Sequence, residues 1–390
     1  MKVLSRFAVG VAALVLALAA PAVPASAQAV PASAQAAPAS AQAAPASTQV
    51  RAQLDTVGFA VSPADMQDVL AASLAAESLP LLSAAPTVPA CVAAILPHDD
   101  YLYAGRTAVH ALPYLQAKRW IVFGVCHACR RVGVRDKLLL DDSLSWRVAG
   151  REFAVDTGLR AALAAQLGSI AEVSAERQAA EHSIEALLPW LGAAVDKPLF
   201  VPVLVSGMDL PSLRERAALF ADALAAICRK RGWVPGRDIG ILISADAVHY
   251  GCEGWGASGG YAPFGCDEAG HAAGRAQDVT LAEATLAGPL SDASVGAFAR
   301  LVWDAASPDF QTKPYRITWC GLWSIPFGLT VAERLQADLG GAPLGGTLLR
   351  YGDSVSDGRL EVPGTRLGVT APNTLGHWVG YATVVYLPGS

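Results

Sequence analysis

Short runs of apolar residues alternate along the chain with stretches in which apolar residues recur every three or four positions. The short runs predict buried strands, and the longer spacing predicts amphipathic helices. We expect strands at 92–96, 120–124, 137–140, 199–205, 239–243, 347–350 and 381–387. We expect helices at 105–115, 157–167, 181–191, 210–231, 268–286, 294–303 and 321–335. The alternation predicts an α/β fold, a single domain with a mostly parallel central sheet and helices on both faces.

Polar residues follow the first of these strands. Pro97 cannot donate to a sheet ladder, so the strand should stop before it. His98, Asp99 and Asp100 then lie just beyond its carboxyl end, which is where open α/β sheets bind ligands. A turn rich in solvated aspartates is the alternative interpretation, and it fits this stretch equally well.

Three more places put His or Cys beside predicted element ends. His127 follows the second strand, Asp246 and His249 follow the strand that ends at Ile243, and Cys320 precedes a helix. A helix start would lower the pKa of Cys320 and favour the thiolate. Each residue alone is more often structural, but convergence at one sheet edge would suit a single transition-metal ion such as Fe, Cu or Zn.

An acidic motif, Glu181-His182-Ser183-Ile184-Glu185, opens the helix that we expect at 181–191. Glu181 and Glu185 are four residues apart and would share a helix face. The motif fits a cluster that orients metal ligands, or a charged first turn that suits the helix dipole. Cys126 and Cys129 flank His127, but a zinc knuckle would need a second such pair, which the sequence lacks.

The N-terminus predicts export. Lys2 and Arg6 precede an apolar run, and Ala25-Ser26-Ala27 fits the cleavage rule, so 1–27 is predicted to be a signal peptide. Residues 28–50 repeat Pro-Ala-Ser with a period of seven and should form a disordered tether. The domain then spans 51–390. The alternative is a misassigned start, with the protein in the cytoplasm.

The composition argues against several classes of protein. Of 390 residues, 53% are hydrophobic and 16% are charged, and the net charge is −5. Without a basic stripe, nucleic-acid binding is not expected. After the N-terminal run no segment is apolar over about twenty residues, so no membrane span is expected. Seven irregularly spaced Cys do not form a disulfide framework, although an exported protein could contain one or two bridges.

Several motifs together resemble the Memo family, the protein B component of the AmmeMemoRadiSam set. The family's Pro-His-Ala-Gly-Tyr is similar to the segment 97–101, which ends at Tyr101, and its Gly-Pro-Ser-His-His to 124–128. Glu-His-Ser-Ile-Glu is intact at 181–185, Ser-Ser-Asp-Phe-Cys-His-Trp-Gly is similar to 244–251, and Cys-Gly stands at 320–321. Departures include Asp99-Asp100 in place of Ala-Gly, Ala128 in place of the second His, and Leu322-Trp323-Ser324 in place of Arg-His-Pro.

The resemblance implies a fold shared with class III extradiol ring-cleaving dioxygenases, which hold non-haem iron. It implies His98, His127 and Cys320 as metal ligands and His249 as the acid/base group. Asp246 lies three residues before His249, beyond the same strand, and is expected to orient its ring or hold its tautomer. Asp99, Asp100, Tyr101, Glu181, His182 and Glu185 would lie around the ligands or in the substrate pocket. A functional link to a radical-SAM protein is also implied.

We therefore expect a redox enzyme or oxygenase that depends on Fe(II) or Cu, with Zn as a further candidate metal. A non-catalytic module that binds metal or a peptide is the first alternative. A thiol or zinc hydrolase using Cys320 with His249 is the second. The small-molecule or peptide ligand is not identified by the sequence.

Export predicts a defined mature terminus. Protein recovered from the exported fraction of an expressing cell should begin at Gln28, because the signal peptide is removed after Ala27. N-terminal sequencing and intact mass check this, and an intact Met1 terminus on protein from the native cytosol would contradict it.

Overall fold

The computed structural model describes residues 50–80, 87–129, 131–252, 260–302, 315–365, 367–371 and 373–389. The predicted signal peptide and all of the predicted tether except Val50 lie outside these residues. The described residues belong to one unit, Ala46–Ser390.

Four adjacent parallel strands form the middle of the sheet, in the order β8 (Leu199–Val205), β3 (Arg119–Val125), β9 (Ile239–Ser244) and β2 (Ala93–Leu96). Antiparallel β13 (Trp378–Pro388), β12 (Leu344–Asp353) and β11 (Gly288–Pro289) extend it beyond β2. On the other side follow β6 (Arg151–Val155), β5 (Ser145–Val148) and β1 (Val50–Ala52). Three short strands complete it, β4 (Leu138–Leu140), β7 (Ala171–Val173) and β10 (His249–Tyr250). The predicted α/β sheet is confirmed.

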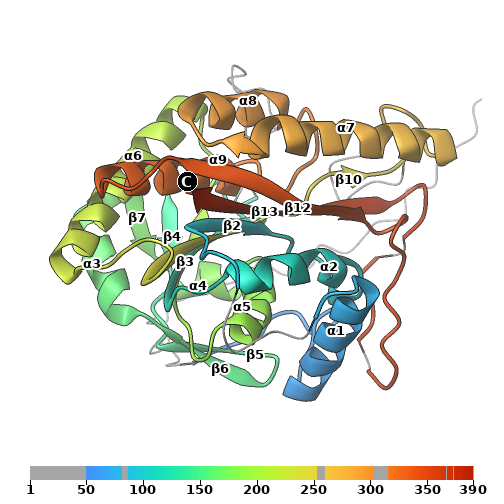
Figure 1. Cartoon of the computed structure of the whole chain (residues 1–390), viewed down its shortest axis with the longest axis horizontal. Coiled ribbons are helices and arrows are strands. Elements are labelled where there is room, and N and C mark those ends of the chain that lie inside the picture. Colours follow the sequence, from blue (N-terminus) through green and yellow to red (C-terminus); the bar gives the residue numbers. More distant parts are fainter. Residues whose placement is uncertain are drawn as a thin grey trace, which may run out of the picture. The chain divides into compact units, whose positions relative to one another are not determined.

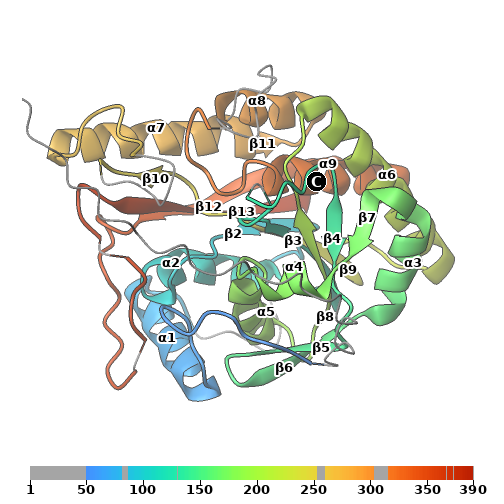
Figure 2. The ribbon, with the colours of Figure 1, turned by 180° about the vertical axis from the view of Figure 1, so that it is seen from behind.

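Helices cover both faces of the sheet (Figures 1 and 2). One face packs α3 (Thr157–Leu167), α6 (Leu210–Arg231), α7 (Glu268–Leu286), α8 (Asp292–Val302) and α9 (Ser324–Asp338). The other packs α1 (Pro63–Ala76), α2 (Tyr101–Ala108) and α5 (Leu188–Ala194). α4 (Ala175–Ala179) and the 3₁₀ helices Val109–Tyr114, Gly168–Ile170 and Glu185–Leu187 complete the described helices. Within these residues no helix is both long and apolar enough to cross a membrane.

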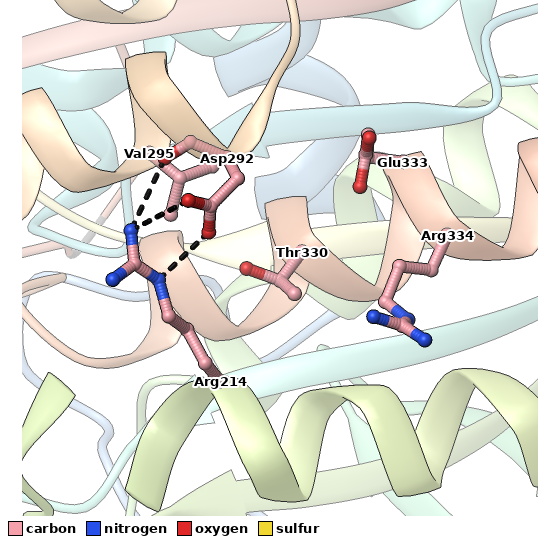
Figure 3. A pocket seen from close by; sticks show the side chains of 6 residues that line it. All are labelled: Arg214, Asp292, Val295, Thr330, Glu333 and Arg334. Atoms are coloured by element: carbon pink, nitrogen blue, oxygen red, sulfur yellow. Dashed lines mark hydrogen bonds and ion pairs between the residues drawn. The ribbon is translucent and has the colours of Figure 1, made fainter. Parts of the chain in front are cut away.

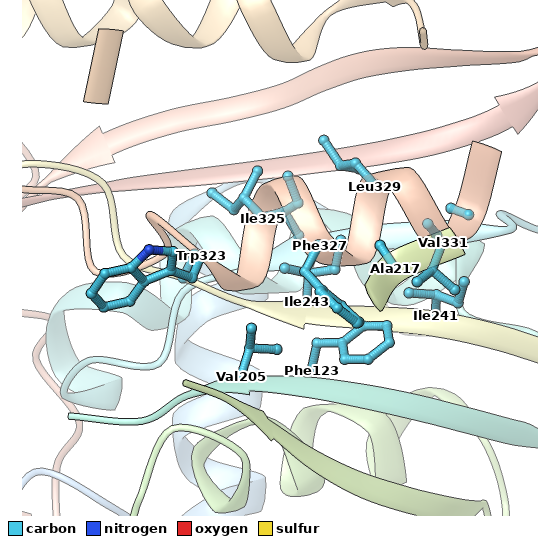
Figure 4. Packing of buried hydrophobic residues seen from close by; sticks show 14 of the residues in the cluster. Phe123, Val205, Ala217, Ile241, Ile243, Trp323, Ile325, Phe327, Leu329 and Val331 are labelled. Atoms are coloured by element: carbon cyan, nitrogen blue, oxygen red, sulfur yellow. The ribbon is translucent and has the colours of Figure 1, made fainter. Parts of the chain in front are cut away.

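The core beneath α9 shows how close the layers come (Figure 4). Phe327 of α9 meets Phe123 of β3 edge to face, with ring centroids 5.2 Å apart. Gly328 follows, and a Cβ there would lie 2.6 Å from the side chain of Ile243 on β9. A glycine is therefore required for α9 to approach the sheet this closely.

Three helix starts differ from the predictions by three residues or more. α2 begins at Tyr101 rather than at Gly105, and α9 begins at Ser324 rather than near Gly321. The helix expected from Glu181 begins only at Leu188, after an irregular turn and a 3₁₀ turn. Pro189 therefore lies in a first helical turn, where its missing N–H costs little, and does not end the helix.

A charged network ties the end of α1 to the rest of the domain. The Glu77 carboxylate accepts hydrogen bonds from Arg106 Nε at 2.6 Å and Arg350 Nε at 2.6 Å, and lies 3.0 Å from His110 Nε2. Arg350 also pairs with Asp357 at 2.7 Å. Burial alone would raise the pKa of Glu77, but these bonds hold it at about 2, below the ordinary 4.5.

Replacing Glu77 with Gln should lower the free energy of unfolding at pH 7 by about 1–3 kcal/mol, because the partly buried guanidinium groups of Arg106 and Arg350 lose one carboxylate partner. Since the folded pKa is depressed, this stabilisation is present above pH 4.5 and disappears as the pH falls through about 2. Denaturant unfolding at pH 7 and pH 3 checks both points. Glu215→Gln, at a side chain that is 71% exposed, is the matched control. Equal stabilities of Glu77→Gln and wild type at pH 7 would contradict the assignment.

Candidate metal centre

The predicted site residues meet at the carboxyl edge of three adjacent strands. His98 lies two residues beyond β2, His127 two residues beyond β3, and Asp246 two residues beyond β9. Because β9 lies between β3 and β2, the three loops are neighbours. The expected convergence at one sheet edge is therefore observed.

The ring of His98 is fixed through Nδ1. Its side chain is 2% exposed, and Nδ1 lies 2.8 Å from Ser244 Oγ. The Ser244 hydroxyl donates its one proton to the Ser183 carbonyl at 2.6 Å, so it accepts from His98 Nδ1–H. Burial lowers the pKa of His98 well below its ordinary value. The ring is therefore neutral, and its Nε2 carries a lone pair.

His127 is held in the same way by Glu181. One carboxylate oxygen lies 2.8 Å from His127 Nδ1, and the other accepts from the His127 backbone N–H at 2.7 Å. Burial would raise the pKa of Glu181, but its contacts with His127 and His182 lower it to about 2. An ionised acceptor thus holds Nδ1–H, and Nε2 is left available.

His182 supplies a third ring. Its Nδ1 lies 2.6 Å from Asp55 Oδ2. Burial lowers the pKa of His182, but Asp55 and Glu181 raise it to about 9. The rings of His98, His127 and His182 lie 5.2–5.5 Å apart between centroids, and each can offer a ligand atom within 4.8 Å of the others.

Cys320 belongs to a second group that shares His98. Ligand atoms of His98, Asp246 and Cys320 also lie within 4.8 Å of one another, and Cys320 Sγ lies 2.9 Å from His249 Nε2. The expected depressed pKa of Cys320 is wrong. Burial, with Asp246, Asp99 and Glu181 adding to it, raises that pKa well above its ordinary value. α9 begins four residues later, so its dipole does not compensate.

Asp246 anchors the loop of His98. Its Oδ1 accepts from the backbone N–H of His98 at 2.9 Å and of Asp99 at 3.2 Å, while Oδ2 lies 3.2 Å from His98 Nε2. Its distance to His249 Nε2 is 3.8 Å, which is longer than a hydrogen bond. The expectation that Asp246 orients the ring of His249 is therefore not what the geometry shows. Burial raises the pKa of Asp246 to about 7.

The other residues of the first loop face elsewhere. Asp99 accepts from Tyr381 Oη at 2.6 Å, and Asp100 accepts from the Thr370 N–H at 2.5 Å. Burial, together with their mutual repulsion, raises the pKa of Asp100 to about 7. The two aspartates line a cavity of about 30 Å³, room for little more than a water molecule. Tyr101 is buried in the core and donates to the Ala186 carbonyl, so it does not face the histidines.

Glu185 likewise lies apart from Glu181. It pairs with Arg51 at 2.5 Å and accepts from the backbone N–H of Leu54 at 2.9 Å, whereas Glu181 holds His127. The expectation that the two carboxylates share a helix face is wrong because residues 181–184 are not helical.

The cysteines beside His127 are bonded to each other. Disulfides join Cys126 to Cys129 and Cys252 to Cys266, while Cys91, Cys228 and Cys320 are free. The first bridge rules out a zinc knuckle at Cys126 and Cys129, since neither sulfur is available as a thiolate.

A larger pocket, of about 250 Å³, lies between α6, α8 and α9 (Figure 3). Arg214 pairs there with Asp292 at 2.7 Å. The pocket is lined by Arg214, Asp292, Val295, Thr330, Glu333 and Arg334. None of these residues is a candidate metal ligand, so the pocket belongs to a separate part of the surface.

A family model described as Memo-like protein matches residues 61–338. The chain belongs to the Memo family. A MEMO1 family protein of Methanosarcina barkeri is 27% identical over 159 residues, 40% of this chain and 54% of the relative. Another, of Sulfurisphaera tokodaii, is 27% identical over 161 residues, 40% of this chain and 52% of the relative. The chain thus spans about half the length of the curated relatives it matches.

Sequence reasoning missed two residues of this Memo-family site, Ser244 and Asp55. Ser244 ends the strand before Asp246, and a hydroxyl at the carboxyl end of a buried strand is a signal that could have marked it. Asp55 pairs with a residue far away in the sequence, and no local pattern indicates that contact.

Replacing Ser244 with Ala should weaken metal binding by about 10–100-fold, because His98 Nδ1–H loses the acceptor that sets its tautomer. Metal titration followed by calorimetry measures the change. Ser206→Ala is the control, since Ser206 is equally buried and bonds only to the backbone of Lys137. An unchanged affinity of Ser244→Ala would show that this hydrogen bond does not serve the site.

Proposed function

We propose that this Memo-family protein binds one transition-metal ion, Fe(II) or Cu with Zn as the alternative, and acts as a non-haem redox enzyme or oxygenase. His98, His127 and Cys320 are the proposed ligands. The observation that carries the proposal is that oxygen acceptors hold Nδ1 of His98 and of His127, which leaves their Nε2 atoms for an ion. Metal-bound histidines are typically held in this way.

The donor types fit such an ion, and His98 is shared by two groups of ligand atoms within 4.8 Å of one another, one with His127 and His182 and one with Asp246 and Cys320. Imidazole nitrogen and sulfur favour Fe, Cu and Zn over Mg and Ca, and the neutral ring of His98 requires no loss of a proton on binding. Once bound, the ion would supply Lewis acidity and electron transfer. The side chain of His127 is 37% exposed, so the centre would be open to small molecules on that side.

His249 is the proposed acid/base group. Burial lowers its pKa to about 3, so its ring is neutral near pH 7 and one ring nitrogen carries a lone pair. Its Nε2 lies next to Cys320 Sγ, one of the proposed ligands. An ion bound at Cys320 would lower the pKa of the thiol, and its proton would then have an acceptor within reach.

The thiol hydrolase is the less favoured alternative. A nucleophilic cysteine works as a thiolate, whereas burial raises the pKa of Cys320 and lowers that of His249. The pair is thus a neutral thiol beside a neutral imidazole.

We also propose that the protein is exported, because two disulfides are typical of an oxidising compartment.

Elemental analysis of wild type and variants tests the proposal. His98→Ala, His127→Ala and Cys320→Ala should each lose the ion, with a loss of affinity well above ~100-fold, whereas Cys228→Ala, at a buried free thiol in α6, should keep it. His249→Ala should keep its metal while oxygen consumption with phenols or thiols falls by about 10²–10⁴-fold. Wild type without metal would contradict the proposal. Full turnover of His249→Ala would favour the non-catalytic binding module.

A further inference from the structure

The chain before α1 clamps the turn that carries His182. Arg51 is buried, its guanidinium donates to the backbone carbonyl of Glu181 at 2.6 Å and of Gln178 at 3.0 Å, and it pairs with Glu185 at 2.5 Å. The same guanidinium lies 3.9 Å from the centroid of the Trp146 ring. Both ends of the turn are thereby fixed to the segment that begins at β1.

Asp55 lies at the end of this segment, and its position is fixed from two sides. Its backbone N–H donates to Glu185 Oε1 at 2.9 Å, and its Oδ2 lies 2.6 Å from His182 Nδ1. Phe59 packs edge to face against the His182 ring, with centroids 6.0 Å apart. The ring therefore has little freedom to rotate.

In its geometry His182 matches the two proposed imidazole ligands. Asp55 Oδ2 forms an ion pair with its Nδ1 at 2.6 Å, whereas Ser244 and Glu181 bind Nδ1 of His98 and His127 by hydrogen bonds. Its Nε2 is the nitrogen for an ion, and binding would release the proton that the raised pKa of about 9 keeps on the ring near neutral pH. The ring lies 5.2 Å from that of His127 and 5.5 Å from that of His98, and the three ligand atoms lie within 4.8 Å of one another.

We propose that His182 is a further ligand of the metal centre and that Asp55 is its positioning residue. The inference rests on the proposed metal binding and extends it beyond the His98, His127 and Cys320 set. Asp55 precedes the segment that the family model matches, 61–338. The segment from Val50 to Asp55 is then part of the site and not only the start of the domain.

Copper(II) loaded into the wild-type protein gives the first test. Nitrogen hyperfine splitting in its electron paramagnetic resonance spectrum should report three coordinated imidazoles, and His182→Ala should report two, with both proteins showing the same circular dichroism. Two imidazoles in wild type, or three in both proteins, would overturn the inference while leaving the proposed function intact. A wild type that binds no ion would instead overturn the proposed function.

Asp55 is tested by metal titration. Asp55→Ala should bind copper or iron about 10–100-fold more weakly than wild type, as is usual when the partner of a ligating histidine is removed. Asp55→Asn should recover most of the affinity, because its amide oxygen still accepts from Nδ1–H. Asp68→Ala, at an exposed aspartate on α1, is the matched control and should bind as wild type. Equal affinities of Asp55→Ala and Asp68→Ala would overturn the positioning role.

Discussion

The site depends on one constraint, that each clustered imidazole has its Nδ1 held by an oxygen of the surrounding fold. For His98 the oxygen is Ser244 Oγ, itself fixed by a bond to Ser183. When one nitrogen of an imidazole ring is held by a hydrogen bond, the tautomer is defined, and so is the direction in which the other nitrogen points. The remaining chemistry of the site follows from that orientation, because three nitrogens come within reach of one ion.

The fold supplies these oxygens from distant parts of the chain. The parallel order β3, β9, β2 places the loops of His127, Asp246 and His98 side by side. The ion pair between Arg51 and Glu185 fixes the turn that carries His182, which lies outside the strands of the sheet. Burial then makes the carboxyl groups costly to ionise unless they are paired. Glu181, which holds His127, has a depressed pKa, whereas burial raises the pKa of Asp246.

Sequence patterns predicted the elements well where the signal is local. The apolar run 199–205 and the capped helix after Asp209 have the predicted bounds, and the strand that stops at Pro97 leads directly to His98. The helix predicted to begin at Glu181 was wrong. Glu181 and Glu185 are four residues apart, but both contact Arg51 from an irregular turn and not from a regular helix. The predicted low pKa of Cys320 was also wrong, because burial raises it. Burial depends on the folded chain and cannot be read from the neighbouring residues in the sequence.

Anomalous X-ray diffraction from crystals of protein purified without added metal tests the central claim most directly. The account predicts one anomalous peak at the absorption edge of iron or copper, within bonding distance of His98 Nε2 and His127 Nε2. A peak elsewhere, or crystals of active protein with no peak between these rings, would contradict it.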